Sequence, residues 1–243
     1  MSTIDRERSI STAELIRAWV TGWAAARSVP APVEAAGGFR LDVGLPEHRV
    51  RYVLHDVGHV AETARTRTDP GTWIKSFGPP ERIGPELTPA WTIGDPEYVM
   101  TGPLRQAAVV PPSGYTIEVE PVGAVVFVRL LAGDGAVAAS GRIGVTGETA
   151  VADQIRTDPA HRRRGLGSVL MTALGDAAAE RGARTGVLVA TPAGRALYTR
   201  LGWTLYGVLT PAWIPEPAIA PEAGVPAAEP SLASSPVQAR PAR

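Results

Sequence analysis

The chain has 243 residues, enough for one large domain or two smaller ones. Lysine and arginine together number 24, as do aspartate and glutamate, so the net charge gives no reason to expect a nucleic acid or an anionic membrane as a partner. Cysteine is absent, which excludes disulfides, thiol nucleophiles and thiolate metal ligands. A polar N-terminus and the lack of a long apolar run predict a cytoplasmic protein.

The first predicted element is a helix. Ser11 opens a capping-box pattern, and apolar residues then recur at helical spacing. A hairpin over residues 39–54 and a short helix over residues 57–66 follow. Residues 69–112 are rich in Pro and Gly, and no element is predicted there.

The segment after residue 112 has a clearer pattern, with antiparallel strands first and a strand–helix–strand unit last. Strands are predicted at 115–119, 124–131, 136–145, 149–157, 185–190 and 203–209, with helices at 164–181 and 192–201. This order predicts the α+β class, with a mixed, mostly antiparallel sheet flanked by helices. We detect no sequence repeat.

The tail from Pro211 is dense in Pro and Ala and poor in large apolar residues, so it is predicted to be disordered. The expected organisation is therefore an N-terminal α+β segment (1–112), a central domain (113–210) and a disordered tail (211–243).

A glycine-rich turn lies between the strand at 149–157 and the following helix. Gly165 and Gly167 let the backbone turn tightly, and the first amides of the helix have no partner and carry a partial positive charge. Arg162 to Arg164 stand directly before them. This combination predicts a site for an anion, and a phosphate is the expected group.

Three kinds of phosphate site have such glycines. A Walker-type loop needs a Gly-Lys-Ser/Thr sequence, and the only lysine, Lys75, lies far away. A dinucleotide fingerprint needs a third glycine where Leu170 stands, and antiparallel strands upstream do not suit that fold. An acyl-CoA site is the third possibility.

The sequence Arg162-Arg163-Arg164-Gly165-Leu166-Gly167 resembles the (Gln/Arg)-x-x-Gly-x-(Gly/Ala) signature of the GNAT superfamily of acyl-CoA N-acyltransferases. About thirty residues on, the run from Ala196 to Trp203 resembles that family's Leu-Tyr-x-x-x-Gly-Phe segment. The resemblance covers roughly residues 113–210. Residues before 113 do not show the family's expected first strand and helix pair. They either supply it in unusual form or are a separate domain, such as a degenerate second copy of the fold.

The resemblance implies acetyl-CoA as co-substrate. Its pyrophosphate would lie on the turn formed by Arg162, Arg163, Arg164, Gly165, Leu166, Gly167 and Ser168. Its pantetheine arm would pair like an extra strand with Ile155, Arg156 and Thr157, which requires a bulge near 154–156 and a splay from the strand at 185–190. Thr191 stands where the family often has a CoA-contacting Asn.

The implied reaction is direct attack of a neutral amine on the thioester, with no metal and no covalent intermediate. A backbone N–H near Ile155 or Arg156 would stabilise the oxyanion. Tyr198 is the candidate general acid for the CoA thiolate, although it could simply pack on its helix. Asp153 is the candidate general base; Glu148 is another, and either could be a solvated charge at the end of a strand.

Other clusters are less specific. His55 and His59 have a metal-like spacing, but no third ligand is evident, so no metal is expected. Trp73, Trp91 and Tyr98 could line a substrate pocket, although packing is the commoner use of such residues.

The resulting prediction is an N-acyltransferase that transfers acetyl from acetyl-CoA to a primary amine. The alternative is a non-catalytic acyl-CoA-binding or regulatory module. No nucleic acid or membrane is expected as a partner, a homodimer is possible by resemblance, and the sequence leaves the amine acceptor open.

Overall fold

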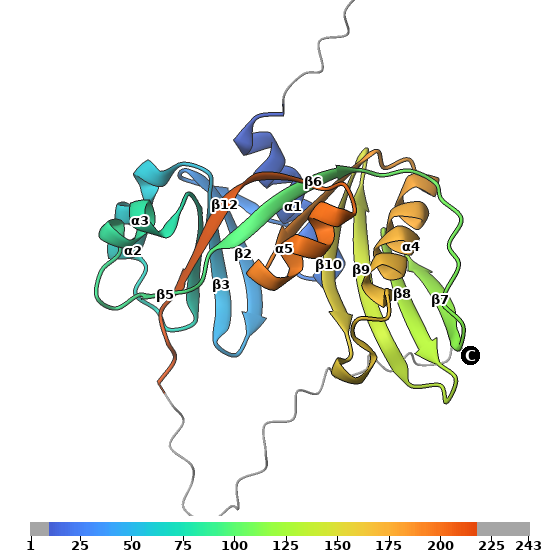
Figure 1. Ribbon diagram of the computed structural model, residues 1–243. Helices are drawn as coiled ribbons and strands as arrows, with labels where there is room; N and C mark the ends of the chain where they lie inside the picture. The colour runs from blue at the N-terminus through green and yellow to red at the C-terminus, as the bar shows by residue number, and fades with distance from the viewer. Residues whose placement is uncertain (1–9, 218–243) are drawn as a thin grey trace, which may run out of the picture.

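The computed structural model describes residues 10–217, which form one 12-stranded sheet flanked by helices (Figure 1). The strand order is β1-β2-β3-β4-β12-β6-β11-β10-β9-β8-β7, and β5 pairs with β12 off this path. The strands are β1 (Val33–Ala35), β2 (Gly38–Leu45), β3 (His48–Leu54), β4 (Thr72–Phe77), β5 (Thr92–Ile93), β6 (Glu97–Pro103), β7 (Tyr115–Val122), β8 (Val125–Ala132), β9 (Val137–Thr146), β10 (Thr149–Thr157), β11 (Thr185–Ala190) and β12 (Thr204–Trp213).

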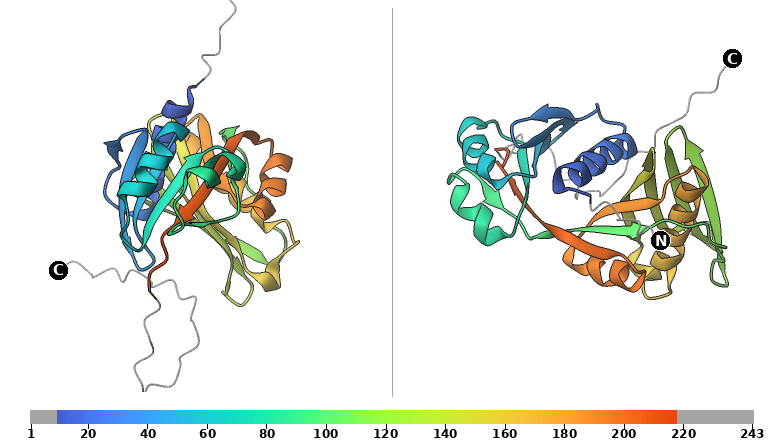
Figure 2. Two further views of the ribbon diagram at one scale, coloured as in Figure 1. Left: turned by 90° about the vertical axis from the view of Figure 1, so that its left-hand side faces the viewer. Right: turned by 90° about the horizontal axis from the view of Figure 1, so that it is seen from above.

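Helices cover both faces of this sheet. They are α1 (Thr12–Arg27), α2 (Val60–Thr66), α3 (Pro80–Ile83), α4 (Leu166–Glu180) and α5 (Pro192–Arg200). Seen from above, α1 lies on one face, and α4 and α5 lie on the other (Figure 2). The apolar side of α1 packs on the middle of the sheet, against Val53, Val99, Val151, Val187 and Leu209. No helix in the described range is long and apolar enough to cross a membrane.

The capping box of α1, the hairpin β2–β3 and the order of elements after residue 112 are confirmed, and β11 has the predicted bounds. Residues 69–112, left without a prediction, contain β4 and β6. The last strand also runs further than expected, to Trp213, because its end pairs with β4 and β5 and Ile214 is buried. The predicted tail therefore begins beyond Pro211, and residues 218–243 lie outside the described range.

The two sides of the sheet repeat one pattern of connections. In the C-terminal side, β9 pairs antiparallel with β10, and α4 then connects β10 to the parallel strand β11. In the N-terminal side, β2, β3, α2 and β4 follow the same order with the same strand directions. β11 next pairs with β6 from the N-terminal segment, and β4 pairs with β12 from the C-terminal segment. Each side of the sheet is thus continued by a strand from the other segment.

One difference between the two sides positions the functional site. β3 and β4 stay paired over Val50–Leu54, whereas β10 and β11 pair only from Thr149 to Val151. On its other edge, β10 has a bulge between Asp153 and Arg156, with Gln154 in the left-handed region at φ 53°. The expected splay and bulge are therefore confirmed, and the second half of β10 has no strand partner on the side of β11.

Helix α1 approaches the sheet closely because Gly22 faces Val151. A Cβ on Gly22 would lie 2.4 Å from Cγ2 of Val151. A Cβ on Gly144 of β9 would in turn lie 2.6 Å from the backbone oxygen of Gly22. The close contact of α1 with β9 and β10 therefore depends on two residues without side chains.

Replacing Gly22 by Ala should destabilise the protein by about 1–3 kcal/mol through overpacking. Helix propensity alone predicts the opposite sign, a gain of up to about 1 kcal/mol. Urea unfolding measures the difference, and Thr21→Ala, one position earlier on α1, is the matched control. A Gly22→Ala protein as stable as the control would show that α1 does not pack this closely.

Candidate functional site

The turn after β10 presents free backbone amides. Asp158 caps a short 3-10 helix, Pro159–His161, by accepting from the amide of Ala160 at 2.8 Å, and α4 then begins at Leu166. Arg163 and Gly165 take left-handed conformations, with φ of 60° and 79°. Among the described residues, the amides of positions 163–167 find no acceptor. They lie at the N-terminus of a 15-residue helix and can bind an anion.

Side chains hold this turn against the rest of the domain. Arg164 donates to the hydroxyl of Tyr115 at 3.0 Å and to the carbonyl of Ala160 at 3.3 Å. The same hydroxyl lies 3.0 Å from Nδ1 of His161. Arg162 and Arg163 are exposed. Sequence analysis missed Tyr115 and His161, because nothing in the local sequence indicates that β7 contacts the turn.

The bulge in β10 is held by an arginine that connects it to α1. Arg142 on β9 donates one guanidinium nitrogen to the side chain of Gln154 and another to the carbonyl of Ala26, the latter at 2.9 Å. The side chain of Ile155 packs inward, where Gly141 leaves room for it. These contacts fix the backbone of β10 where its edge lacks a strand partner.

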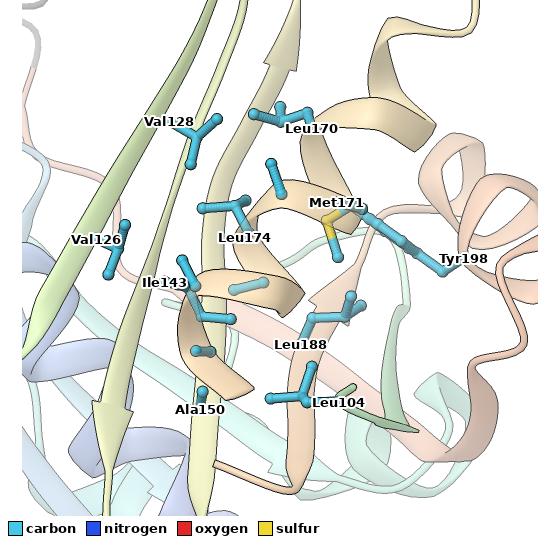
Figure 3. Packing of buried hydrophobic residues seen from close by; sticks show 14 of the residues in the cluster. Leu104, Val126, Val128, Ile143, Ala150, Leu170, Met171, Leu174, Leu188 and Tyr198 are labelled. Carbon is cyan, nitrogen blue, oxygen red and sulfur yellow. The ribbon is translucent and has the colours of Figure 1, made fainter. Parts of the chain in front are cut away.

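Tyr198 is buried on α5. Thr191 caps that helix by accepting from the amide of Gly194 at 3.2 Å. The tyrosine side chain extends toward Met171 of α4 (Figure 3), and its hydroxyl makes no hydrogen bond to any residue in the described range. Burial, and secondly the charge of Asp153, raise its pKa to about 12. The phenol is therefore protonated at neutral pH and can donate a proton.

A cavity of about 280 Å³ occupies the space between the splayed strands. From the predicted site it is lined by Asp153, Ile155, Thr191 and Tyr198. The structure thus brings these four residues together, while Arg156, Thr157 and the Arg162–Ser168 turn lie outside the lining. Both oxygens of Asp153 accept from Arg27, at 2.7 and 3.1 Å, and its side chain is 12% exposed.

The sequence comparison identifies the C-terminal part of the chain. Residues 85–203 match the family model described as the acetyltransferase (GNAT) family. Residues 85–203 thus form a GNAT-family domain. No curated protein sequence matches the chain.

The fold agrees with that of solved GNAT structures. A GCN5-related N-acetyltransferase from Kribbella flavida is similar with a TM-score of 0.63 at 16% identity, over 86% of this chain and 98% of that one. Another from Sphaerobacter thermophilus is similar with a TM-score of 0.52 at 12% identity, over 72% of this chain and 75% of that one. These likenesses confirm the predicted α+β, GNAT-like fold, and together with the family match they support an N-acyltransferase in general terms.

The N-terminal segment contributes charged and aromatic residues to the GNAT cavity that sequence analysis missed. They are Trp19, Trp23 and Arg27 of α1, Arg51 of β3, Lys75 of β4 and Glu97 of β6. Lys75 forms an ion pair with Glu97, and both side chains are largely buried. The sequence held one indication that Lys75 is a functional residue. It is the only lysine of the chain and stands among apolar residues.

The histidine cluster lies outside the cavity of the GNAT domain. Asp56 accepts from the amide of Gly58 at 2.9 Å and from the ring of His59, whose Nδ1 is 3.1 Å away. Across residues 10–217, no three His, Asp or Glu side chains are grouped so that they could hold a metal ion. The cluster caps the short helix before α2.

Two of the aromatic residues suggested as a substrate wall have packing partners instead. Trp73 stacks on Trp213 with ring centroids 4.9 Å apart. Trp91 is buried and donates its indole N–H to the carbonyl of Ala64 at 3.0 Å. Neither residue, nor Tyr98, lines the cavity, whose aromatic wall comes from α1.

Proposed function

We propose that this protein is an N-acyltransferase that transfers an acetyl group from acetyl-CoA to a primary amine by direct attack. The observation that carries the proposal is the row of unpaired amides at 163–167, which lies beside a β10 edge that lacks a strand partner. A diphosphate needs the first feature and a pantetheine arm needs the second.

Acetyl-CoA would bind through the backbone more than through side chains. Its pyrophosphate would accept from amides of the Arg162–Ser168 turn, and the exposed side chain of Arg163 could reach it. The side chain of Arg162 donates to the carbonyl of Thr157 at 3.4 Å and would have to leave that contact to do the same. Its arm would extend along Ile155 to Thr157 and place the thioester at the cavity beside Tyr198. Thr191, whose hydroxyl caps α5, would shape the cavity wall next to the arm.

In the proposed reaction the amine nitrogen attacks the thioester carbonyl carbon. An amide at the bulge, near Ile155 or Arg156, would stabilise the oxyanion. As the carbon–sulfur bond breaks, Tyr198 would give its proton to the leaving thiolate. Asp153 would take the amine proton through a water, using oxygen lone pairs that Arg27 leaves available. The total charge of the site is unchanged, and transfer of the proton from Asp153 back to the Tyr198 phenolate through water would restore both groups for the next turnover.

We further propose that residues 1–112 are a degenerate copy of the GNAT half formed by 113–210. The repeated strand order supports this, and so does the fact that β3 and β4 show no splay. At the place that corresponds to the CoA turn, the side chain of Asp56 accepts a hydrogen bond from the amide of Gly58, so this amide is not available to a ligand. The helix that follows, α2, is only seven residues long. The N-terminal copy would then form the acceptor side of the cavity.

A cytoplasmic location and a homodimer stay predictions.

Replacing Gly165 by Val should weaken acetyl-CoA binding by about 5–30-fold, because a left-handed conformation costs a residue with a side chain about 1–2 kcal/mol. Isothermal titration calorimetry measures the affinity. Gly182→Val is the matched control, since Gly182 follows the other end of α4 with φ 88° and equally open surroundings. A wild-type protein that binds no acetyl-CoA at high micromolar concentration would refute the proposal.

Replacing Tyr198 by Phe should lower turnover by about 100–10,000-fold, the usual range for loss of a general acid. Affinity for acetyl-CoA should stay unchanged, because the ring still fills its place between α4 and α5. Release of free CoA thiol in the presence of an amine library measures turnover. Tyr206→Phe on β12, whose hydroxyl donates to the carbonyl of Ile10, is the control. Equal turnover in both variants would remove the acid role from Tyr198, and no thiol release by the wild type would indicate a binding module.

A further inference from the structure

The charges around the cavity do not balance. Arg27 pairs with Asp153, and Lys75 pairs with Glu97. Arg51 forms no direct ion pair with a described carboxylate, and the charges of Glu97 and Asp153 act on it only at longer range. Its Nε donates to Nε2 of His48 at 3.1 Å, and its two terminal nitrogens have no acceptor in the described range.

Arg51 is nevertheless almost fully buried. It is 6% exposed, and its guanidinium lies 4.2 Å from the ring centroid of Trp23. Burial lowers its pKa to about 10, so it keeps its charge at neutral pH. Burying an unpaired charge is costly unless a partner is supplied.

His48 cannot supply the missing negative charge. Burial, and secondly the neighbouring cations Arg51, Lys75 and Arg27, lower its pKa to about 3. The imidazole is therefore neutral over the physiological range and acts only as a hydrogen-bond acceptor. The two free nitrogens of Arg51 stay available for an anion that enters from the cavity.

The sheet directs Arg51 toward the reacting end of the cavity. In the parallel pair β3–β4, Arg51 is the partner of Trp73 and Val53 is the partner of Lys75, so Arg51 and Lys75 share one face of the sheet. Val53 on that face packs in the cluster of α1, so the two cations lie on the α1 side. The same cavity reaches Asp153 and Tyr198. A small molecule held at Arg51 would therefore extend toward the thioester.

We propose that the acceptor is a small amine that carries a carboxylate, and that Arg51 binds this carboxylate. The inference rests on the proposed acyltransferase function. A carboxylate matches the planar fork of a guanidinium with two parallel hydrogen bonds. Its single negative charge neutralises Arg51. A phosphate would leave negative charge in excess, because Arg27 and Lys75 are already paired with Asp153 and Glu97. Trp19 and Trp23 form the wall beside the acceptor.

The size of the cavity limits the acceptor. Its 280 Å³ lies just below the range of about 300–1,000 Å³ that is typical of small-molecule pockets. A free amino acid or a similar aminocarboxylate therefore fits the cavity better than the end of a folded polypeptide does.

The test compares amino acids with their amides as acceptors, in pairs such as leucine and leucinamide, with acetyl-CoA as donor. The wild type should prefer the acid in kcat/KM, and Arg51→Gln should lose this preference through a KM for the acid raised by about 10–150-fold, the range for loss of a charged hydrogen bond. Arg49→Gln, two positions earlier on β3 and exposed, should behave like the wild type. Arg51→Lys, which keeps the charge without the fork, should fall between the two.

A second measurement does not depend on turnover. The N-acetylated amino acid should raise the melting temperature of the wild type but not that of Arg51→Gln. Acetyl-CoA affinity should be equal in both, which also shows that the variant is folded.

The two proposals fail in different ways. If amides are acetylated as well as acids, or if Arg51→Gln keeps the preference for acids, the carboxylate site is wrong and the acyltransferase stands. If acetyl-CoA binds but no amine of either kind is acetylated, the acyltransferase itself is wrong and the carboxylate site falls with it.

Discussion

The loss of pairing between β10 and β11 after Val151 and Val187 is the constraint on which the site depends. It leaves one edge of β10 open, and it opens a cavity through the sheet at the place where the bulge turns the backbone of β10. The bulge is maintained by Arg142, which bridges Gln154 and the end of α1. Because Gly22 lets α1 approach Val151 closely, the packing of this helix and the shape of the open edge are coupled.

The N-terminal segment repeats the connections of the C-terminal one but keeps its strands paired. The turns and helices that follow the corresponding strands also differ. In the C-terminal half, the turn before the 15-residue helix α4 has amides without an acceptor among the described residues. In the N-terminal half, Asp56 accepts from an amide of the turn before the 7-residue helix α2. The charged residues that the N-terminal segment sends to the cavity, Arg51, Lys75 and Glu97, lie on strands that could pack without them. Lys75 and Glu97 neutralise each other, and the burial of Arg51 is explained if it binds a substrate.

Local sequence patterns were sufficient to predict much of the fold. Glycines at 165 and 167, the helical spacing that follows and the apolar run at 185–190 predict the cradle and β11. β6 could not be predicted, because Pro96 and Pro103 bound a short run whose strand character comes from pairing with β11 and β12. The acceptor side of the cavity was missed for the same reason. Its residues come from α1, β3, β4 and β6, and only long-range pairing brings them together.

Hydrogen exchange of the backbone amides, with and without coenzyme A, tests the central claim most directly. The amides of residues 163–167 have no acceptor among the described residues, so they should exchange fast in the free protein and slow down when coenzyme A binds. Residues 155–157 of β10 should slow with them, and the start of α2 should not change. Unchanged exchange at 163–167, or protection at α2 instead, would contradict a coenzyme held by this turn and the open edge of β10.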